Sequence, residues 1–202
     1  ISNLLNIGII HTETTPLNIT FYNKYTKAML KSFRNSICME NLSVNHVKAR
    51  IKKYDSENYY YSPEMQVISF MITRNINTLE KTILQEITNN IVSGFHMLNI
   101  FTNEFRCNYK FLLEEIFSIL IGKNIDEIIE LSYPSMKTWD NYALSLSYLS
   151  LIGYTFTTTE YINRPIIEFL KMLLLNIHPD YKRRNISNNY IGYLSNVIYN
   201  SN

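Results

Sequence analysis

The sequence predicts a mainly α-helical protein with short β-strands near its N-terminus. Long apolar segments repeat at helical spacing, and the 202 residues include only five glycines and five prolines. That is too few for a sandwich of many strands and turns. Hydrophobic residues make up 46% of the chain, which is enough to bury a sizeable core. We therefore expect one globular domain over residues 1–202.

The first third of the chain holds the predicted strands. Residues 1–8, ISNLLNIG, have the pattern of a helix that ends at Gly8. After a polar loop, two short strands are expected at ITFY and AMLKSF, where β-prone apolar residues are bounded by polar ones. Residues 34–62 are polar and show little periodicity, so they are predicted to form a long loop.

Two buried helical segments are predicted in the middle of the chain. The helical pattern begins at about Met65, and Thr78 is a candidate N-cap for apolar residues that recur every fourth position: Leu79, Ile83, Ile87 and Ile91. Residues 109–121 are apolar on most sides until Gly122 ends that helix. We expect both segments to be well buried.

The last third contains two stronger helices and one weaker helix. The first runs over residues 138–153 and places three residues on one face: Leu144, Tyr148 and Leu151. The second follows Asn163, has Pro165 in its first turn, and breaks at residues 178–179, His-Pro. The weaker, amphipathic helix is expected over residues 188–199.

Charge and cysteine content exclude several classes of function. Lysine and arginine total 19 against 17 acidic residues, and a net charge of +2 is too weak to direct the chain to nucleic acid or to an anionic membrane. Residues 182–184, Lys-Arg-Arg, are interpreted as a solvated run. Cys38 and Cys107 lack metal-ligand spacing, so we expect neither a disulfide framework nor a zinc site. Without an apolar run of about 18 residues, no membrane span is expected, and we predict a soluble, cytoplasmic protein.

Four segments resemble, in order, the C-terminal lobe of eukaryotic-type protein kinases. The stretch GIIHTETTPLNI resembles the catalytic loop H-R-D-L-x-x-x-N, with His11, Glu13 and Asn18 at the matching positions. The stretch YYYSPEM resembles the A-P-E motif, with Glu64 as its acid. The resemblance implies catalytic positions at Glu13 and Asn18 and a mainly structural role for His11.

The other two segments lie near the C-terminus of the chain. The stretch TWDNYALSL resembles the long central helix of that lobe, and Asp140 matches the aspartate that tethers the catalytic loop. The stretch HPDYKRRNI resembles the closing motif, in which Arg184 matches the arginine that pairs with the A-P-E glutamate. We therefore predict a largely buried ion pair between Glu64 and Arg184, and hydrogen bonds from the loop around His11 to Asp140.

Departures from the family pattern point away from phosphotransfer. Glu13 replaces the catalytic aspartate, and a displacement of about 1 Å can cost roughly 10²-fold in rate. Thr15 stands where a lysine contacts the transferred phosphate. The best match to the magnesium-binding D-F-G motif is residues 32–34, Ser-Phe-Arg, and no aspartate precedes Asp55. A glycine-rich loop and a V-A-I-K lysine are also absent from the sequence.

One segment has no counterpart in an ordinary kinase lobe. Residues 66–137 separate the A-P-E-like motif from the central helix, which the family joins by a short loop. We interpret this segment as a helical insertion that either docks a partner or thickens the core. Apolar residues of the predicted strands would be left uncovered without an N-terminal lobe, so we expect the insertion, a missing N-terminal segment or a protein partner to cover residues 18–33.

Three hypotheses of function follow. The first is a kinase-like domain (a pseudokinase) that has lost phosphotransfer and acts as a scaffold, with no cofactor. The second is a divergent serine/threonine protein kinase, using ATP and Mg²⁺, whose N-terminal lobe is missing from this chain. The third is a helical structural or assembly protein of a virion, in which Glu13 and Asn18 are ordinary loop residues. The composition, rich in Asn, Ile, Tyr and Lys, resembles kinases of large AT-rich DNA viruses, which would place the protein in the host cytoplasm or the virion.

Overall fold

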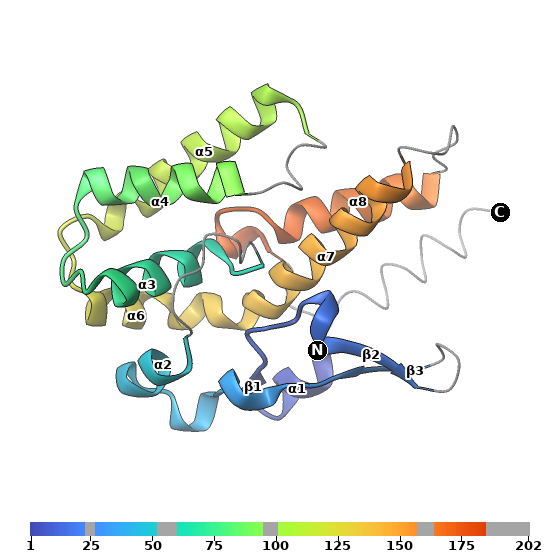
Figure 1. Cartoon of the computed structure of the whole chain (residues 1–202), viewed down its shortest axis with the longest axis horizontal. Helices are drawn as coiled ribbons and strands as arrows, with labels where there is room; N and C mark the ends of the chain where they lie inside the picture. Colours follow the sequence, from blue (N-terminus) through green and yellow to red (C-terminus); the bar gives the residue numbers. More distant parts are fainter. Residues whose placement is uncertain (23–26, 52–59, 95–100, 157–163, 185–202) are drawn as a thin grey trace.

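The computed structural model describes residues 1–22, 27–51, 60–94, 101–156 and 164–184. It is mainly α-helical with a few short strands near the N-terminus, which confirms the predicted class. Helices α4 (Lys81–Gly94) and α5 (Asn103–Phe117) pack on each other at one end of the molecule (Figure 1). Strands β2 (Ile19–Tyr22) and β3 (Lys27–Leu30) form an antiparallel hairpin away from that end.

The N-terminal elements match the sequence pattern. Helix α1 (Ser2–Asn6) is followed by Gly8 at φ 71°, a left-handed conformation that glycine adopts without strain. Strand β1 (Ile9–Ile10) then pairs antiparallel with β4 (Ile37–Cys38) and leads the chain into the polar loop. Strand β2 lies where ITFY predicted it, and β3 covers the first half of AMLKSF but ends at Leu30, before residues 31–33.

The prediction of a long loop over residues 34–62 is wrong. Besides β4, this segment contains helix α2 (Val44–Arg50), whose first turn is capped by the Ser43 side chain accepting from the His46 amide. Val47 is the buried residue of this helix. A seven-residue helix with one buried position has no detectable apolar period, which explains why the pattern did not reveal it. Residues 52–59 lie outside the described part.

Helix α3 (Pro63–Arg74) occupies the centre of the molecule. The Ser62 hydroxyl accepts from the Met65 amide, and Pro63 takes the first helical position, where its missing N–H costs nothing. Every residue from Pro63 to Met71 is buried, so neighbouring elements surround the first half of the helix. This position explains how an acid at Glu64, in the first turn, comes to be buried.

Two features of the middle region differ from the prediction. Thr78 is not the cap of α4, which begins at Lys81; Thr78 instead forms an isolated antiparallel bridge with Asn124. Helix α6 (Ile125–Ser132) was not predicted, and it begins with a capping box in which Asn124 and Glu127 exchange side-chain and backbone hydrogen bonds. The helix predicted over residues 109–121 is instead α5 (Asn103–Phe117), followed by a short 3-10 turn at Ser118–Leu120, so it ends before Gly122, which has φ 82°. The expected burial holds for one face only, because Phe111 and Ile119 are exposed.

The two long C-terminal helices are present, but two of the three residues that the pattern placed on one face of the first helix are exposed. Helices α7 (Trp139–Phe156) and α8 (Arg164–Asn176) pack on each other. The core residues of α7 include Tyr142, Leu146 and Leu149, whereas Tyr148 and Leu151 are exposed. Because α7 is apolar on most of its circumference, spacing alone does not select its buried face. The helix predicted over residues 188–199 lies outside the described part.

The described residues of the segment 66–137 contribute to the common hydrophobic core. One hydrophobic cluster joins Ile10 of β1, Leu79, Leu113 of α5 and Trp139 of α7. That the segment is an insertion into a kinase-like lobe stays a prediction. None of the described helices is both long and apolar enough to cross a membrane.

The expectation that the insertion covers residues 18–33 is wrong. The exposed fractions of Phe21, Met29 and Phe33 are 56%, 43% and 44%. Helices α4 and α5 instead pack against each other, and α4 also packs against α3, away from the hairpin (Figure 1).

Candidate functional site

The polar loop after β1 is buried because α7 supplies its hydrogen-bond acceptor. Asp140, in the first turn of α7, accepts from the His11 amide at 2.7 Å and from the Thr12 amide at 2.9 Å. The Thr14 hydroxyl donates to the same carboxylate at 2.9 Å. The predicted contact between Asp140 and this loop is confirmed. Burial raises the pKa of Asp140, and the hydrogen bonds from the loop partly offset that effect.

The other side of the loop is tied to residues 31–36. The His11 ring donates from Nε2 to the Lys31 carbonyl at 2.8 Å, which fixes the tautomer because a carbonyl only accepts. The Thr12 hydroxyl donates to the Asn35 carbonyl at 3.1 Å. The Phe33 ring meets the His11 ring edge-on, with centroids 4.8 Å apart. His11 therefore holds two chain segments together, as a structural residue does.

Two residues at this junction adopt left-handed backbone conformations. Thr12 has φ 67° and Ser32 has φ 69°. Such conformations cost about 1–3 kcal/mol each for residues with a side chain, and they persist when neighbouring contacts fix them. Here the contacts are the two bonds of Thr12, to Asp140 and to Asn35. The loop is thus held in a shape that an isolated peptide would not keep.

Glu13 and Asn18, the two candidate catalytic residues, lie in the same loop. The Asn18 side-chain amide donates to the Glu13 carbonyl at 2.9 Å, so it closes the loop through the backbone of Glu13. The exposed fraction of Glu13 is only 8%. The structure therefore brings the two residues together, with the amide nitrogen of Asn18 occupied in holding the loop.

The chemistry around Ser32 does not suit a magnesium ion. Among the described residues, no group of three or more His, Cys, Asp or Glu side chains could hold a metal. Ser32 offers a neutral hydroxyl where Mg²⁺ prefers carboxylate oxygens. The Arg50 guanidinium donates to the Arg34 carbonyl at 2.7 Å, which brings a positive charge next to this turn.

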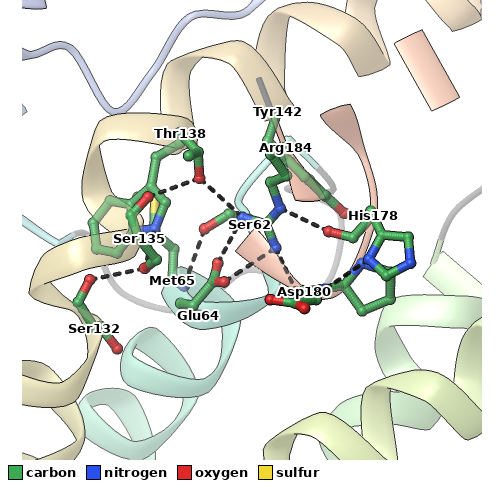
Figure 2. A network of polar contacts seen from close by, with 12 residues as sticks. Ser62, Glu64, Met65, Ser132, Ser135, Thr138, Tyr142, His178, Asp180 and Arg184 are labelled. Carbon is green, nitrogen blue, oxygen red and sulfur yellow. Dashed lines mark hydrogen bonds and ion pairs between the residues drawn. The ribbon is translucent and has the colours of Figure 1, made fainter. Parts of the chain in front are cut away.

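The ion pair predicted between Glu64 and Arg184 is present (Figure 2). It is bidentate: Nη1 of Arg184 donates to Oε2 and Nη2 donates to Oε1, each at 3.0 Å. The exposed fractions of the two side chains are 0% for Arg184 and 6% for Glu64. Arg184 also donates to the carbonyls of His178 and Pro179, so the C-terminal turn closes onto the start of α3.

Two tyrosines extend this ion pair into α5. The Arg184 guanidinium lies 5.1 Å from the centroid of the Tyr142 ring. The Tyr142 and Tyr109 hydroxyls are 3.2 Å apart, and Tyr109 donates to the Ile177 carbonyl at 2.8 Å. Burial raises the pKa of Tyr109 to about 12 and raises that of Tyr142 well above its usual value. Sequence reasoning missed this cluster because both tyrosines lie within apolar helical segments and resemble ordinary core residues.

The raised pKa of Tyr109 predicts a loss of stability at alkaline pH. Tyrosine in the unfolded chain loses its proton near pH 10, whereas folded Tyr109 keeps it until about pH 12. The unfolded state binds fewer protons in this window, so the free energy of unfolding falls as pH rises from 10 to 12. Tyr109 alone should account for about 2–3 kcal/mol.

Urea unfolding at several pH values measures this loss. Tyr109→Phe should flatten the decline, while Tyr148→Phe, at an exposed position on α7, should leave it unchanged. An equally steep decline in the Tyr109→Phe variant would show that Tyr109 is not its source.

Comparison with known proteins finds no relative: no family model matches the chain, and no curated protein or solved structure matches it.

Proposed function

We propose that this chain is a protein kinase-like C-terminal lobe that does not transfer phosphate and serves as a protein-interaction module. The supporting observation is that the four motifs converge through contacts between distant positions. Asp140 reaches the His11 amide across 129 positions, and Arg184 reaches Glu64 across 120. Both contacts are those that the resemblance predicts, and both are buried.

Loss of phosphotransfer is supported by the residues at the would-be metal site. Phosphoryl transfer depends on acidic and amide oxygens that hold magnesium against the phosphates. Ser32 replaces the metal-binding acid of the resemblance, and the cationic surroundings of Arg34 oppose a divalent ion. Glu13 has a longer side chain than the aspartate it replaces and is nearly buried.

The interaction role is supported by apolar side chains that remain exposed. Phe21 and Met29 on the hairpin and Leu151 on α7 are exposed by 56%, 43% and 60%. Soluble proteins seldom leave a contiguous apolar surface of several hundred Å² uncovered without using it. We propose that a protein partner, or a missing N-terminal segment, covers residues 18–33.

Nucleotide binding provides the test of this proposal. We expect millimolar ATP with Mg²⁺ to raise the melting temperature by less than about 1 °C. A ligand stabilises a protein only at concentrations well above its Kd, and this chain is expected to bind Mg-ATP too weakly to meet that condition. No γ-phosphate should be transferred to the chain itself or to a general protein substrate. Mg²⁺ alone and ATP with EDTA are the controls.

A shift of several degrees that EDTA reverses would contradict the proposal. It would favour the alternative, a divergent serine/threonine kinase that uses ATP and Mg²⁺. In that case Glu13→Gln should abolish any transfer while leaving the thermal shift in place, since this substitution removes the carboxylate that orients the substrate hydroxyl.

A further inference from the structure

A cavity of about 610 Å³ lies between the β2–β3 hairpin and helix α7. The hairpin contributes one complete face: Ile19 is paired with Leu30 and Phe21 with Ala28, and all four line the cavity. Because side chains alternate along a strand, these four residues point to the same side of the sheet. The hairpin therefore presents an entirely apolar face to the cavity.

Helix α7 contributes the opposite wall. Leu144, Ser147, Tyr148 and Leu151 line the cavity, at the spacing i, i+3, i+4 and i+7 of a single helical stripe, and Ser150 lines it beside this stripe. Tyr148 and Leu151 are exposed by 42% and 60%, so this stripe is not closed by the hairpin. The apolar hairpin face and a wall of leucines, serines and a tyrosine on α7 thus face each other across a space large enough for several side chains.

The lining selects an uncharged occupant. Among the residues that the structure describes, no Asp, Glu, Lys, Arg or His side chain lines the cavity. A charged group placed there would lose its hydration without gaining a partner, which is unfavourable. Nucleotides and acidic or basic peptide faces are therefore poor fits.

Hydrogen bonding selects the conformation of the occupant. Two of the lining hydroxyls are already used as donors: Thr14 donates to Asp140 at 2.9 Å and Ser147 donates to the Ala143 carbonyl at 3.0 Å. An extended peptide on this face would bring many backbone N–H and C=O groups to a wall that offers few partners. A helix satisfies its backbone internally and needs only apolar contacts.

We propose that this cavity is a docking groove for an amphipathic helix of a protein partner, which inserts uncharged apolar side chains spaced i, i+3 or i+4, and i+7. The inference rests on the proposed interaction role and gives that role its binding surface. The stripe on α7 has the spacing by which one helix packs on another, and the hairpin face encloses the inserted helix from the other side.

Selection from two displayed peptide libraries tests the groove. One library presents stabilised helices randomised at i, i+3, i+4 and i+7, and the other presents extended peptides of equal length. We expect the 202-residue chain to select helices with Leu, Ile, Phe or Met at those positions. Fluorescence anisotropy with the synthesised peptides then measures affinity.

A matched pair of substitutions places the binding site. Ala28 and Ala49 are both exposed alanines, but only Ala28 lines the cavity. Ala28→Glu should weaken helix binding by roughly tenfold or more, because it adds an unpaired charge to the groove, whereas Ala49→Glu should leave it unchanged. Ser150→Arg, from the α7 side, should weaken binding similarly and guards against a local folding defect in the hairpin.

Several results would overturn the proposal. One is selection of extended peptides, and another is binding of the uncharged dye Nile red without any peptide binding. A third is an equal loss of helix-binding affinity in Ala28→Glu and Ala49→Glu. A fourth is self-association of the chain that Ala28→Glu abolishes. The Mg-ATP assay separates the two proposals. If the chain transfers phosphate and also binds helices, the groove proposal stands and the proposed loss of phosphotransfer is refuted. If it neither transfers phosphate nor binds helices, only the groove proposal is refuted.

Discussion

Replacing Glu64 with alanine is expected to destabilise the protein by about 3–5 kcal/mol. The substitution leaves the Arg184 guanidinium, whose side chain is fully buried, without its bidentate acceptor. Arg184 keeps its hydrogen bonds to the His178 and Pro179 carbonyls, but these acceptors are neutral and do not balance the charge of the guanidinium. The urea midpoint of unfolding, followed by circular dichroism, measures the effect.

The matched control is Glu86→Ala. Glu86 lies 3.7 Å from Arg74, and both side chains are about half exposed, so its loss should change the free energy of unfolding by less than about 0.5 kcal/mol. Glu64→Gln should be intermediate or as severe, since the amide keeps the shape but not the charge. Equal urea midpoints for Glu64→Ala and wild type would show that the pair does not hold the C-terminal turn against α3.

Asp140→Asn is expected to cost about 2–4 kcal/mol. The carboxylate accepts from the His11 amide through Oδ2, and from Thr12 and Thr14 through Oδ1. An asparagine has one acceptor oxygen, so its NH₂ group must face a backbone N–H donor on one side. A buried amide of the loop is then left without a partner, at the end of the strand that leads into the site.

Hydrogen exchange separates this local effect from general destabilisation. In Asp140→Asn, the His11 and Thr12 amides should exchange faster than amides in the buried first half of α3 when both are corrected for global stability. Asp126→Asn is the control, because Asp126 pairs with Lys48 at the surface and its side chain is 58% exposed. Unchanged protection at His11 and Thr12 would refute the role of Asp140 as their acceptor.

The long-range contacts of the site could be predicted because they join complementary groups. Glu64 and Arg184 carry opposite charges, Glu64 directly follows Pro63, and Asp140 lies at the start of a strongly apolar helix. Desolvation forces such charges to find partners once their helices are buried. The resemblance supplied the pairing, and the structure contains it. What these residues do for a partner or a substrate stays a proposal.

Other parts could not be predicted, for different physical reasons. Helix α6 carried a signal that was overlooked, since Asn124 followed by Glu127 is a capping box. Helix α2 carried almost none, because Val47 is its buried residue. The orientation of α7 and the position of α4 and α5 depend on which apolar faces meet, and that choice is made by tertiary packing rather than by local spacing.

The loop that Asp140 holds is separated from it by nearly two thirds of the chain. Its amides at His11 and Thr12 lie 129 and 128 positions before their acceptor. A ribosome adds about 5–20 residues per second, so the loop spends on the order of ten seconds outside the ribosome without the carboxylate that shapes it. During synthesis the loop after β1 therefore lacks its Asp140 acceptor, and it reaches its final conformation only when α7 emerges and packs against it.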